Sequence, residues 1–180
     1  VAYQVGDAQQ LEKISAAFAG LPGEGDINIL IWTTTPWTIP SSQAISVGAE
    51  LDYVLVQIAG EQGPLRLICA QALLESVVQR LGVEDCQQLA TCKGQALENV
   101  VARHPFYDRD IPVLLGEHVT TDAGSGCVHT APDHGMEDFV VSRQYGIGTL
   151  NYILDNGLFG ENVELFAGQH VYKVDESVLE

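Results

Sequence analysis

The chain has 180 residues, 46% of them hydrophobic and 18% charged, which is enough apolar material for one globular domain with its own core. Its formal charge is −16, with eight Lys and Arg against 24 Asp and Glu, and this excludes a broad groove that binds nucleic acid through many phosphate contacts. Four cysteines without a C-x-x-C pair indicate neither a zinc ribbon nor a disulfide framework. The composition therefore predicts a soluble protein of the reducing cytoplasm.

The ends of the sequence indicate a piece of a longer protein. The first residue is Val1 rather than methionine, and the chain stops at Glu180 with no helix cap before it. No apolar run reaches the roughly 18 residues of a membrane span, and the first residues carry no secretory signal. We therefore expect residues 1–180 to be a single domain cut from a larger chain, with no membrane partner.

The first half of the chain should contain two helices and several strands. Residues 9–18 have apolar side chains at helical spacing, and the glycines of residues 20–25 end that helix. Strand-forming runs follow at residues 27–32, 44–47, 51–58 and 65–69. The last two are joined by a turn with Gly and Pro, which predicts a hairpin. Residues 70–81 place their apolar side chains on one helical face, and Gly82 is a typical C-terminal stop.

The second half contains shorter strands and one further helix. Strands are predicted at residues 87–91, 100–103, 111–115 and 126–130. Residues 137–145 indicate a helix ended by Gly146, and residues 149–174 indicate strand and turn, with a tight turn at residues 155–157. Many short strands with few helices predict an α+β, β-barrel-like domain with peripheral helices rather than a doubly wound nucleotide fold.

Residues 32–40 combine four threonines, two tryptophans and two prolines directly after an apolar strand. Pro36 and Pro40 fix φ and keep the preceding residue extended, so this segment should be a rigid loop. Each threonine hydroxyl has one donor and two acceptor sites, and together they could hold a water and a ribose. The hydroxyls could equally cap the backbone of their own loop, as threonine often does.

Residues 124–132 have the sequence Gly-Ser-Gly-Cys-Val-His-Thr-Ala-Pro, in which the glycines permit close approach of another backbone or a ligand. A short strand that ends at a pocket is expected. Its period of two places Cys127, His129 and Ala131 on one face, which predicts that Val128 faces the core and His129 the pocket. The segment does not have the strand-to-helix context of a dinucleotide-binding fingerprint.

Asp138 lies in the first turn of the helix predicted at residues 137–145. The helix dipole stabilises a carboxylate at this position, so Asp138 could be no more than a helix-stabilising acid. It also follows His129 closely enough to project over the same cleft, where it would bind a substrate ammonium through a charged hydrogen bond of roughly 1.5–3 kcal/mol. The spacing alone leaves both interpretations open.

Two other kinds of site are less well supported. His118, His129 and His134 match no standard zinc spacing, so no metal site is predicted. Cys127 and His129 could form a nucleophile and its base, but residues i and i+2 of one strand are poorly placed for that pairing. Cys127 is therefore interpreted as a small buried filler.

The threonine peptide Trp-Thr-Thr-Thr-Pro-Trp-Thr and the Gly-x-Gly strand that leads to Asp138 resemble, in this order, the editing domain of isoleucyl-tRNA synthetase. The tripled threonine and His129 are similar to the isoleucine enzyme, whereas the valine and leucine enzymes usually carry an arginine in that peptide. The resemblance implies that residues 1–180 are one editing domain, called connective peptide 1, inserted in a larger class I synthetase. The family's ATP-binding signatures His-Ile-Gly-His and Lys-Met-Ser-Lys-Ser are absent, so this piece should not aminoacylate.

The resemblance implies hydrolysis of valine wrongly attached to the isoleucine tRNA, giving free valine and intact tRNA without a metal or organic cofactor. Asp138 would hold the α-ammonium of valine, and His129 would line the side-chain pocket and exclude isoleucine. The substrate would also be bound by Trp32, Thr33, Thr34, Thr35 and Thr38, which place the terminal adenosine, the ester and the attacking water. The catalytic set would be Asp138, Thr33, Thr34 and Thr35. The partners would be the mischarged 3′ end of the isoleucine tRNA, valine and the rest of the parent synthetase.

Two alternatives to this enzyme remain open. The chain could be a binding module for the amino acid or the tRNA 3′ end that does not turn over, or the editing domain of a valyl- or leucyl-tRNA synthetase.

Neither an Asp138 bound to an ammonium nor a threonine hydroxyl is an effective general base. Positioning and the tRNA's own neighbouring hydroxyl would then have to carry the activation of water.

Overall fold

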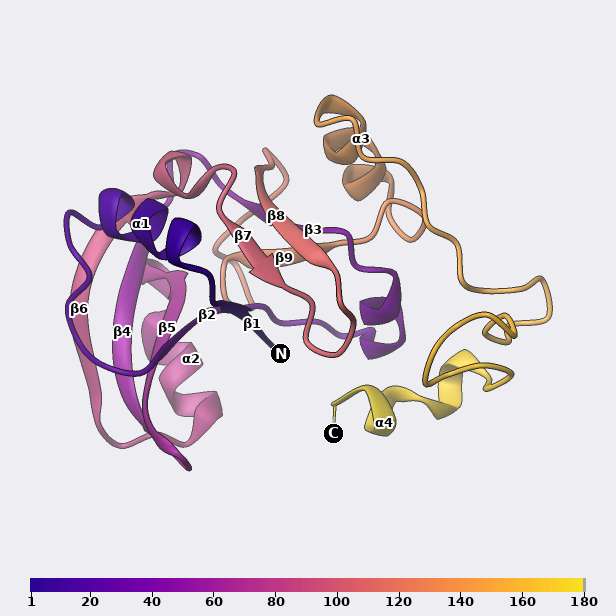
Figure 1. Cartoon of the computed structure of the whole chain (residues 1–180), viewed down its shortest axis with the longest axis horizontal. Helices are drawn as coiled ribbons and strands as arrows, with labels where there is room; N and C mark the ends of the chain where they lie inside the picture. The colour runs from indigo at the N-terminus through magenta and orange to yellow at the C-terminus, as the bar shows by residue number, and fades with distance from the viewer. Residues whose placement is uncertain (180) are drawn as a thin grey trace.

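A computed structural model describes residues 1–179 and arranges them around two β-sheets (Figure 1). The first sheet has five strands in the order β1-β2-β5-β4-β6, and the second has four in the order β7-β8-β3-β9. The strands are β1 (Ala2–Val5), β2 (Asp26–Leu30), β3 (Ala44–Val47), β4 (Asp52–Gly60), β5 (Gly63–Ala70), β6 (Cys86–Lys93), β7 (Val101–Arg103), β8 (Asp110–Leu115) and β9 (Cys127–Thr130). The α-helices are α1 (Ala8–Ala17), α2 (Leu74–Leu81), α3 (Met136–Gln144) and α4 (Asp175–Leu179), and the 3-10 turns are η1 (Pro36–Ser41), η2 (Gln71–Leu73), η3 (Gly94–Leu97) and η4 (Val171–Lys173).

Strand β4 packs against two separate hydrophobic cores. Successive side chains of a strand point to opposite faces, so Tyr53 and Leu55 pack in the main core while Val54 and Val56 pack with Val77 of α2. The predicted hairpin is confirmed, because β4 and β5 pair antiparallel along their whole length. The nearly continuous apolar sequence of β4 follows from this burial on both faces.

The helices begin and end for local reasons. Asp7 caps α1 by accepting a hydrogen bond from the Gln10 backbone N–H at 2.8 Å. Helix α2 stops at Gly82, whose φ of 65° is the left-handed conformation that glycine adopts most easily at a helix C-terminus. Each of the three helices predicted from periodicity is present, although the second begins as the 3-10 turn η2.

Strand β3 brings together the two segments that carry the sequence motifs. It pairs parallel with β8 on one side and antiparallel with β9 on the other. Turn η1 precedes β3 along the chain, and Ile45 of β3 lies opposite His129 of β9. The threonine peptide and the His129 strand are therefore neighbours in space, although 91 positions separate Thr38 from His129.

The structure corrects the predicted fold in two places. The α+β class is confirmed, but within residues 1–179 both sheets are open and no closed barrel forms. The alternation of side chains along a strand does not specify its partners, so it could not show whether a sheet closes. Residues 149–174 form isolated bridges rather than the predicted strands, because left-handed turns at Gly157 and Gly168 leave only short extended runs between them.

The segment after α3 contacts the loop between β7 and β8 and completes the main core. Phe159, Phe166 and Val174 from this segment are buried there, and α4 contacts η1. Strand β1 and helix α4 were not expected from the sequence. No helix among residues 1–179 has the length and apolar character needed to span a bilayer.

Candidate functional site

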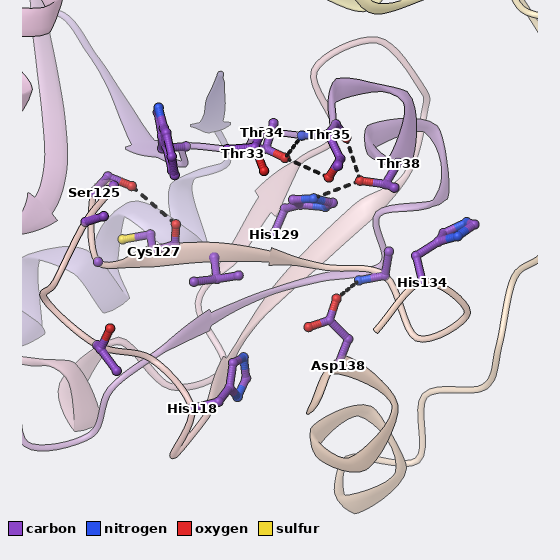
Figure 2. A pocket seen from close by; sticks show the side chains of 17 residues that line it. Thr33, Thr34, Thr35, Thr38, His118, Ser125, Cys127, His129, His134 and Asp138 are labelled. Carbon is purple, nitrogen blue, oxygen red and sulfur yellow. Dashed lines mark hydrogen bonds between the residues drawn. The ribbon is translucent and has the colours of Figure 1, made fainter. Parts of the chain in front are cut away.

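A pocket of about 330 Å³ lies where the loop before η1, strand β9 and the start of α3 meet (Figure 2). Every residue assigned to substrate binding from the sequence lines this pocket: Trp32, Thr33, Thr34, Thr35, Thr38, His129 and Asp138. In Figure 2 the labelled threonines and His129 lie on one side of β9, and Asp138 and His118 lie on the other. The structure thus brings the two sequence motifs into one cavity.

The threonines differ in how far their hydroxyls are already used. Thr33 Oγ1 accepts a hydrogen bond from the Thr35 backbone N–H at 3.0 Å and lies 3.3 Å from Thr35 Oγ1. Thr38 Oγ1 donates to the Thr35 carbonyl at 2.8 Å. Within residues 1–179 the Thr34 hydroxyl has no such partner, and it lines the pocket. The capping interpretation therefore holds for Thr33 and Thr38, whereas Thr34 keeps its full hydrogen-bonding capacity.

The hydrogen bond between Thr38 and His129 defines the tautomer of the imidazole. Thr38 Oγ1 lies 3.1 Å from His129 Nε2, and its single proton is already donated to the Thr35 carbonyl. Nε2 must therefore carry a proton and donate it to Thr38, which leaves Nδ1 as an unprotonated acceptor. Burial, reinforced by the nearby His134 and His104, lowers the pKa of His129 to about 4, so the ring is neutral at pH 7.

His129 Nδ1 has no hydrogen-bond partner among the described residues, although the atom is buried. The side chain is 8% exposed and lines the pocket. A buried acceptor without a partner is costly unless a ligand or a water supplies a donor. The wall at His129 is thus uncharged and keeps one buried acceptor available to a ligand.

Asp138 lies in the first turn of α3 and is half-buried. Its Oδ2 accepts a hydrogen bond from the Ala131 backbone N–H at 2.9 Å, which ties the start of α3 to the end of β9. Burial raises the pKa of Asp138 above its usual value, and the bond from Ala131 partly offsets this. A cation placed beside the carboxyl would lower the pKa again, so the site favours a positively charged ligand.

Sequence reasoning assigned no substrate-binding role to several other groups of the pocket. His118, His134 and Ser125 line it together with His129, and His118 Nε2 is buried without a partner among residues 1–179. His118 follows β8, and it reaches the pocket because β8 and β9 both pair with β3. No signal in the sequence reveals that pairing. In the described part of the chain, no three His, Cys, Asp or Glu side chains are grouped as metal ligands.

The face assignment made for β9 is wrong for Val128, which is only half-buried and lines the pocket. Cys127 lines the pocket as assigned, although it is also packed in the main core. The pocket wraps around the end of the strand, so both faces of β9 contribute to it. Burial raises the pKa of the Cys127 thiol well above its usual value, which makes it a poor nucleophile and agrees with its interpretation as a filler.

Comparison with known proteins gives consistent results. The family described as "Leucyl-tRNA synthetase, editing domain" matches residues 18–168. The chain is 61% identical over 162 residues to the isoleucine–tRNA ligase of Teredinibacter turnerae, in an alignment that covers 90% of this chain and 17% of that protein. It is 60% identical over 169 residues to the isoleucine–tRNA ligase of Saccharophagus degradans, covering 94% of this chain and 18% of that protein. The chain thus spans less than a fifth of the length of these curated relatives.

Solved structures with the same fold include leucyl-tRNA synthetase domains. The crystal structure of GlLeuRS-CP1 matches with a TM-score of 0.77 and 15% identity, covering 99% of this chain and 92% of that chain. The cytosolic leucyl-tRNA synthetase editing domain of P. knowlesi matches with a TM-score of 0.73 and 12% identity, covering 99% of this chain and 90% of that chain. The matched family extends across the threonine peptide, His129 and Asp138, so the chain belongs to the family of tRNA synthetase editing domains, and within it to the isoleucyl-tRNA synthetase group.

Proposed function

We propose that this domain hydrolyses the ester of valine wrongly attached to the isoleucine tRNA. The observation that carries the proposal is the meeting of a half-buried carboxylate, a neutral imidazole wall and a free threonine hydroxyl in one pocket of about 330 Å³. These are the groups needed to hold an amino acid by its ammonium, test its side chain and place a water at its ester.

Asp138 binds the α-ammonium of the substrate in this proposal. One of its oxygens is used by Ala131, and the other remains for the ligand. A charge-assisted hydrogen bond of this type contributes about 1.5–3 kcal/mol. Because the carboxyl is half-buried, water competes weakly for it, and the bond is stronger than at an exposed surface.

His129 and Thr38 form a wall that selects by size. Their hydrogen bond holds the imidazole in one orientation, so the ring cannot move away from a larger side chain. One methylene is worth only about 1–3 kcal/mol in an apolar pocket, as is established for the synthetic site of isoleucyl-tRNA synthetases themselves. A second pocket that accepts valine and rejects isoleucine by steric contact therefore adds discrimination that the first site lacks.

Thr34 positions the attacking water, with Thr33 and Thr35 holding the loop in shape. The water oxygen bonds to the ester carbonyl carbon, the bond from that carbon to the ribose oxygen breaks, and the ribose hydroxyl leaves with a proton. Neither Asp138 bound to an ammonium nor a threonine hydroxyl is an efficient general base, so in this proposal proximity and the neighbouring ribose hydroxyl account for the rate. In this proposal Thr34 and Asp138 contact the water and the substrate, and Thr33 and Thr35 are positioning residues that hold Thr34 in place.

The chain works as a single module whose parent synthetase delivers the tRNA. Its charge of −16 gives it little attraction for the body of a polyanion, so most tRNA binding comes from other parts of the parent enzyme. A second candidate function is a module that binds the amino acid or the tRNA 3′ end without turnover. Editing of a valine or leucine tRNA is less well supported, because the relatives at 60–61% identity are isoleucine–tRNA ligases.

The proposal is tested by deacylation of valyl-tRNA and isoleucyl-tRNA, both on the isoleucine tRNA, under multiple turnover. Asp138→Asn keeps the shape of the side chain and its bond to Ala131, and should lower kcat/KM for the valyl ester by about 10- to 150-fold, which corresponds to 1.5–3 kcal/mol. The matched control is Asp133→Asn, an exposed acid outside the pocket, which should retain activity. Valyl and isoleucyl esters that both decay at the rate of free solution would instead support the binding module.

A further inference from the structure

A second, apolar hollow adjoins the main pocket beside Trp32. It has a volume of about 110 Å³, and Trp32, Gly124 and Ser125 line both cavities. Gly124 lies close to the indole, since a Cβ at that position would come within 3.3 Å of Trp32 Cε3. Trp32 is 45% exposed, so it forms an open partition between the two cavities rather than part of the core.

Arg80 lies at the outer edge of this hollow, in the last turn of α2. Its guanidinium carbon is 5.2 Å from the centroid of the Trp32 ring, which is the geometry of a cation–π contact. The side chain is exposed, and within residues 1–179 it takes part in none of the ion pairs. The indole thus holds a guanidinium whose N–H groups remain available to a ligand.

The charge around the two cavities makes Arg80 distinctive. Among the described residues that line either cavity, Arg80 is the only one with a Lys or Arg side chain. His129 is neutral at pH 7 because burial lowers its pKa to about 4. In a chain with a net charge of −16, a phosphate that approaches the pocket therefore finds Arg80 as the one basic side chain of the described lining, while the Val1 ammonium in the same hollow is bonded to the Ile31 carbonyl.

We propose that Arg80, held by Trp32, binds the phosphodiester that joins the terminal nucleotide of the tRNA to the nucleotide before it, and that the apolar hollow receives the base of that preceding nucleotide. This inference rests on the proposed function, because it takes the terminal adenosine to occupy the main pocket. A guanidinium presents a planar set of donors that matches two phosphate oxygens. Leu30, Val77 and Leu81 line the hollow and offer the apolar surface that a nucleobase face requires.

The test compares two substrates that differ in the proposed contact. One is valyl-adenosine, which has no phosphodiester, and the other is a short valylated oligonucleotide with the sequence of the tRNA 3′ end. Arg80→Gln should raise KM for the oligonucleotide ester about 10-fold and leave valyl-adenosine unchanged. It should also reduce the slope of log(kcat/KM) against log[salt] by about 0.7, the value for one phosphate of a single strand. Arg80→Lys, which keeps the charge, should recover part of the loss.

The matched control is Arg143→Gln. Arg143 also lies in the last turn of a helix and also contacts an aromatic ring, at 6.0 Å from the Phe139 centroid, but it lines neither cavity. Its replacement should change neither substrate. An Arg80→Gln variant that slows both esters equally would show that Arg80 only supports Trp32, and an unchanged variant would show no contact at all; either result overturns the inference.

The two proposals fail in different ways. If the unaltered chain hydrolyses neither ester, the hydrolytic function fails, and the phosphate contact is then judged by fluorescence anisotropy of the uncharged, 5′-labelled oligonucleotide. Weaker binding by Arg80→Gln than by Arg143→Gln would still support the inference, and equal binding would refute it.

Discussion

The hydroxyl of Thr38 fixes the imidazole of His129. It accepts the Nε2 proton because its own proton is bonded to the Thr35 carbonyl, so one short side chain determines which ring nitrogen is protonated. A threonine in this position joins the two motifs directly. The pocket therefore depends on a residue that, judged from the sequence, resembles the other threonines of its peptide.

Thr38→Val should release this constraint. The substitution keeps the volume but leaves the His129 Nε2–H buried without an acceptor, which costs about 1–3 kcal/mol of unfolding free energy. Thr38→Ser keeps the hydroxyl and should lie close to the parent. Urea unfolding measures the stability, and the ¹⁵N shifts of the imidazole report the tautomer. If valine and serine variants give the same imidazole spectrum, the proposed hydrogen bond does not set the tautomer.

The entry into β9 depends on a glycine. Gly126 has φ of 71°, and a Cβ on it would lie 2.3 Å from the Ala70 Cβ, so both its conformation and its surroundings require glycine. Its carbonyl accepts a hydrogen bond from the Tyr53 hydroxyl at 2.6 Å. Gly126 directly precedes β9, the strand that carries His129. This end of β9 is thus anchored to Tyr53 of the five-stranded sheet.

Gly126→Ala should destabilise the chain by about 2–5 kcal/mol, since it adds the cost of a left-handed alanine to that of overpacking. Gly82→Ala is the control, because its φ of 65° is equally left-handed but no atom lies within 4 Å of the added Cβ. That variant should lose only about 1–2 kcal/mol. Thermal and urea unfolding of the pair separate the two costs, and equal losses would mean that the contact with Ala70 relaxes freely.

Elements whose signals are local could be predicted from the sequence. The β4–β5 hairpin follows from apolar runs around a turn, and α2 follows from its apolar face and Gly82. The open sheets could not be predicted, nor could the inclusion of Val128 and His118 in the pocket, because each depends on which strands pair with one another. The main site residues could be named because the two motifs resemble a known family, while the spacing alone left the role of Asp138 open.

Two buried histidines make the stability of the whole molecule depend on pH. Burial lowers the pKa of both His104 and His129 to about 4. His104 also uses both ring nitrogens, with Nε2 bonded to the Ile39 carbonyl and Nδ1 accepting from the Tyr107 backbone N–H. Unfolding exposes each ring and restores a pKa near 6.5, so the unfolded chain binds more protons between about pH 6.5 and 4.

The contribution of these two neutral histidines to the free energy of unfolding should therefore be fully present above pH 7 and be lost on acidification. Each histidine accounts for a loss of about 2 kcal/mol between pH 7 and pH 5, obtained from the two pKa values by linkage. Urea unfolding at pH 7, 6 and 5 measures it, and this range keeps most carboxylates ionised. His104→Asn should flatten the profile by about half if it folds. A stability that stays constant over this range would mean that the rings are protonated in the folded state.

The position of β3 between β8 and β9 also determines at which stage of folding the pocket forms. The contact between Thr38 and His129 spans 91 positions, so β9 must be in register with β3 before the two walls meet. Such distant pairings form late, because the chain must first lose the entropy of closing a long loop. In a nascent or partly unfolded chain, the threonine hydroxyls and the Asp138 carboxylate therefore lie apart. The pocket cannot perform its chemistry until the wall formed by Thr38 and His129 is in place.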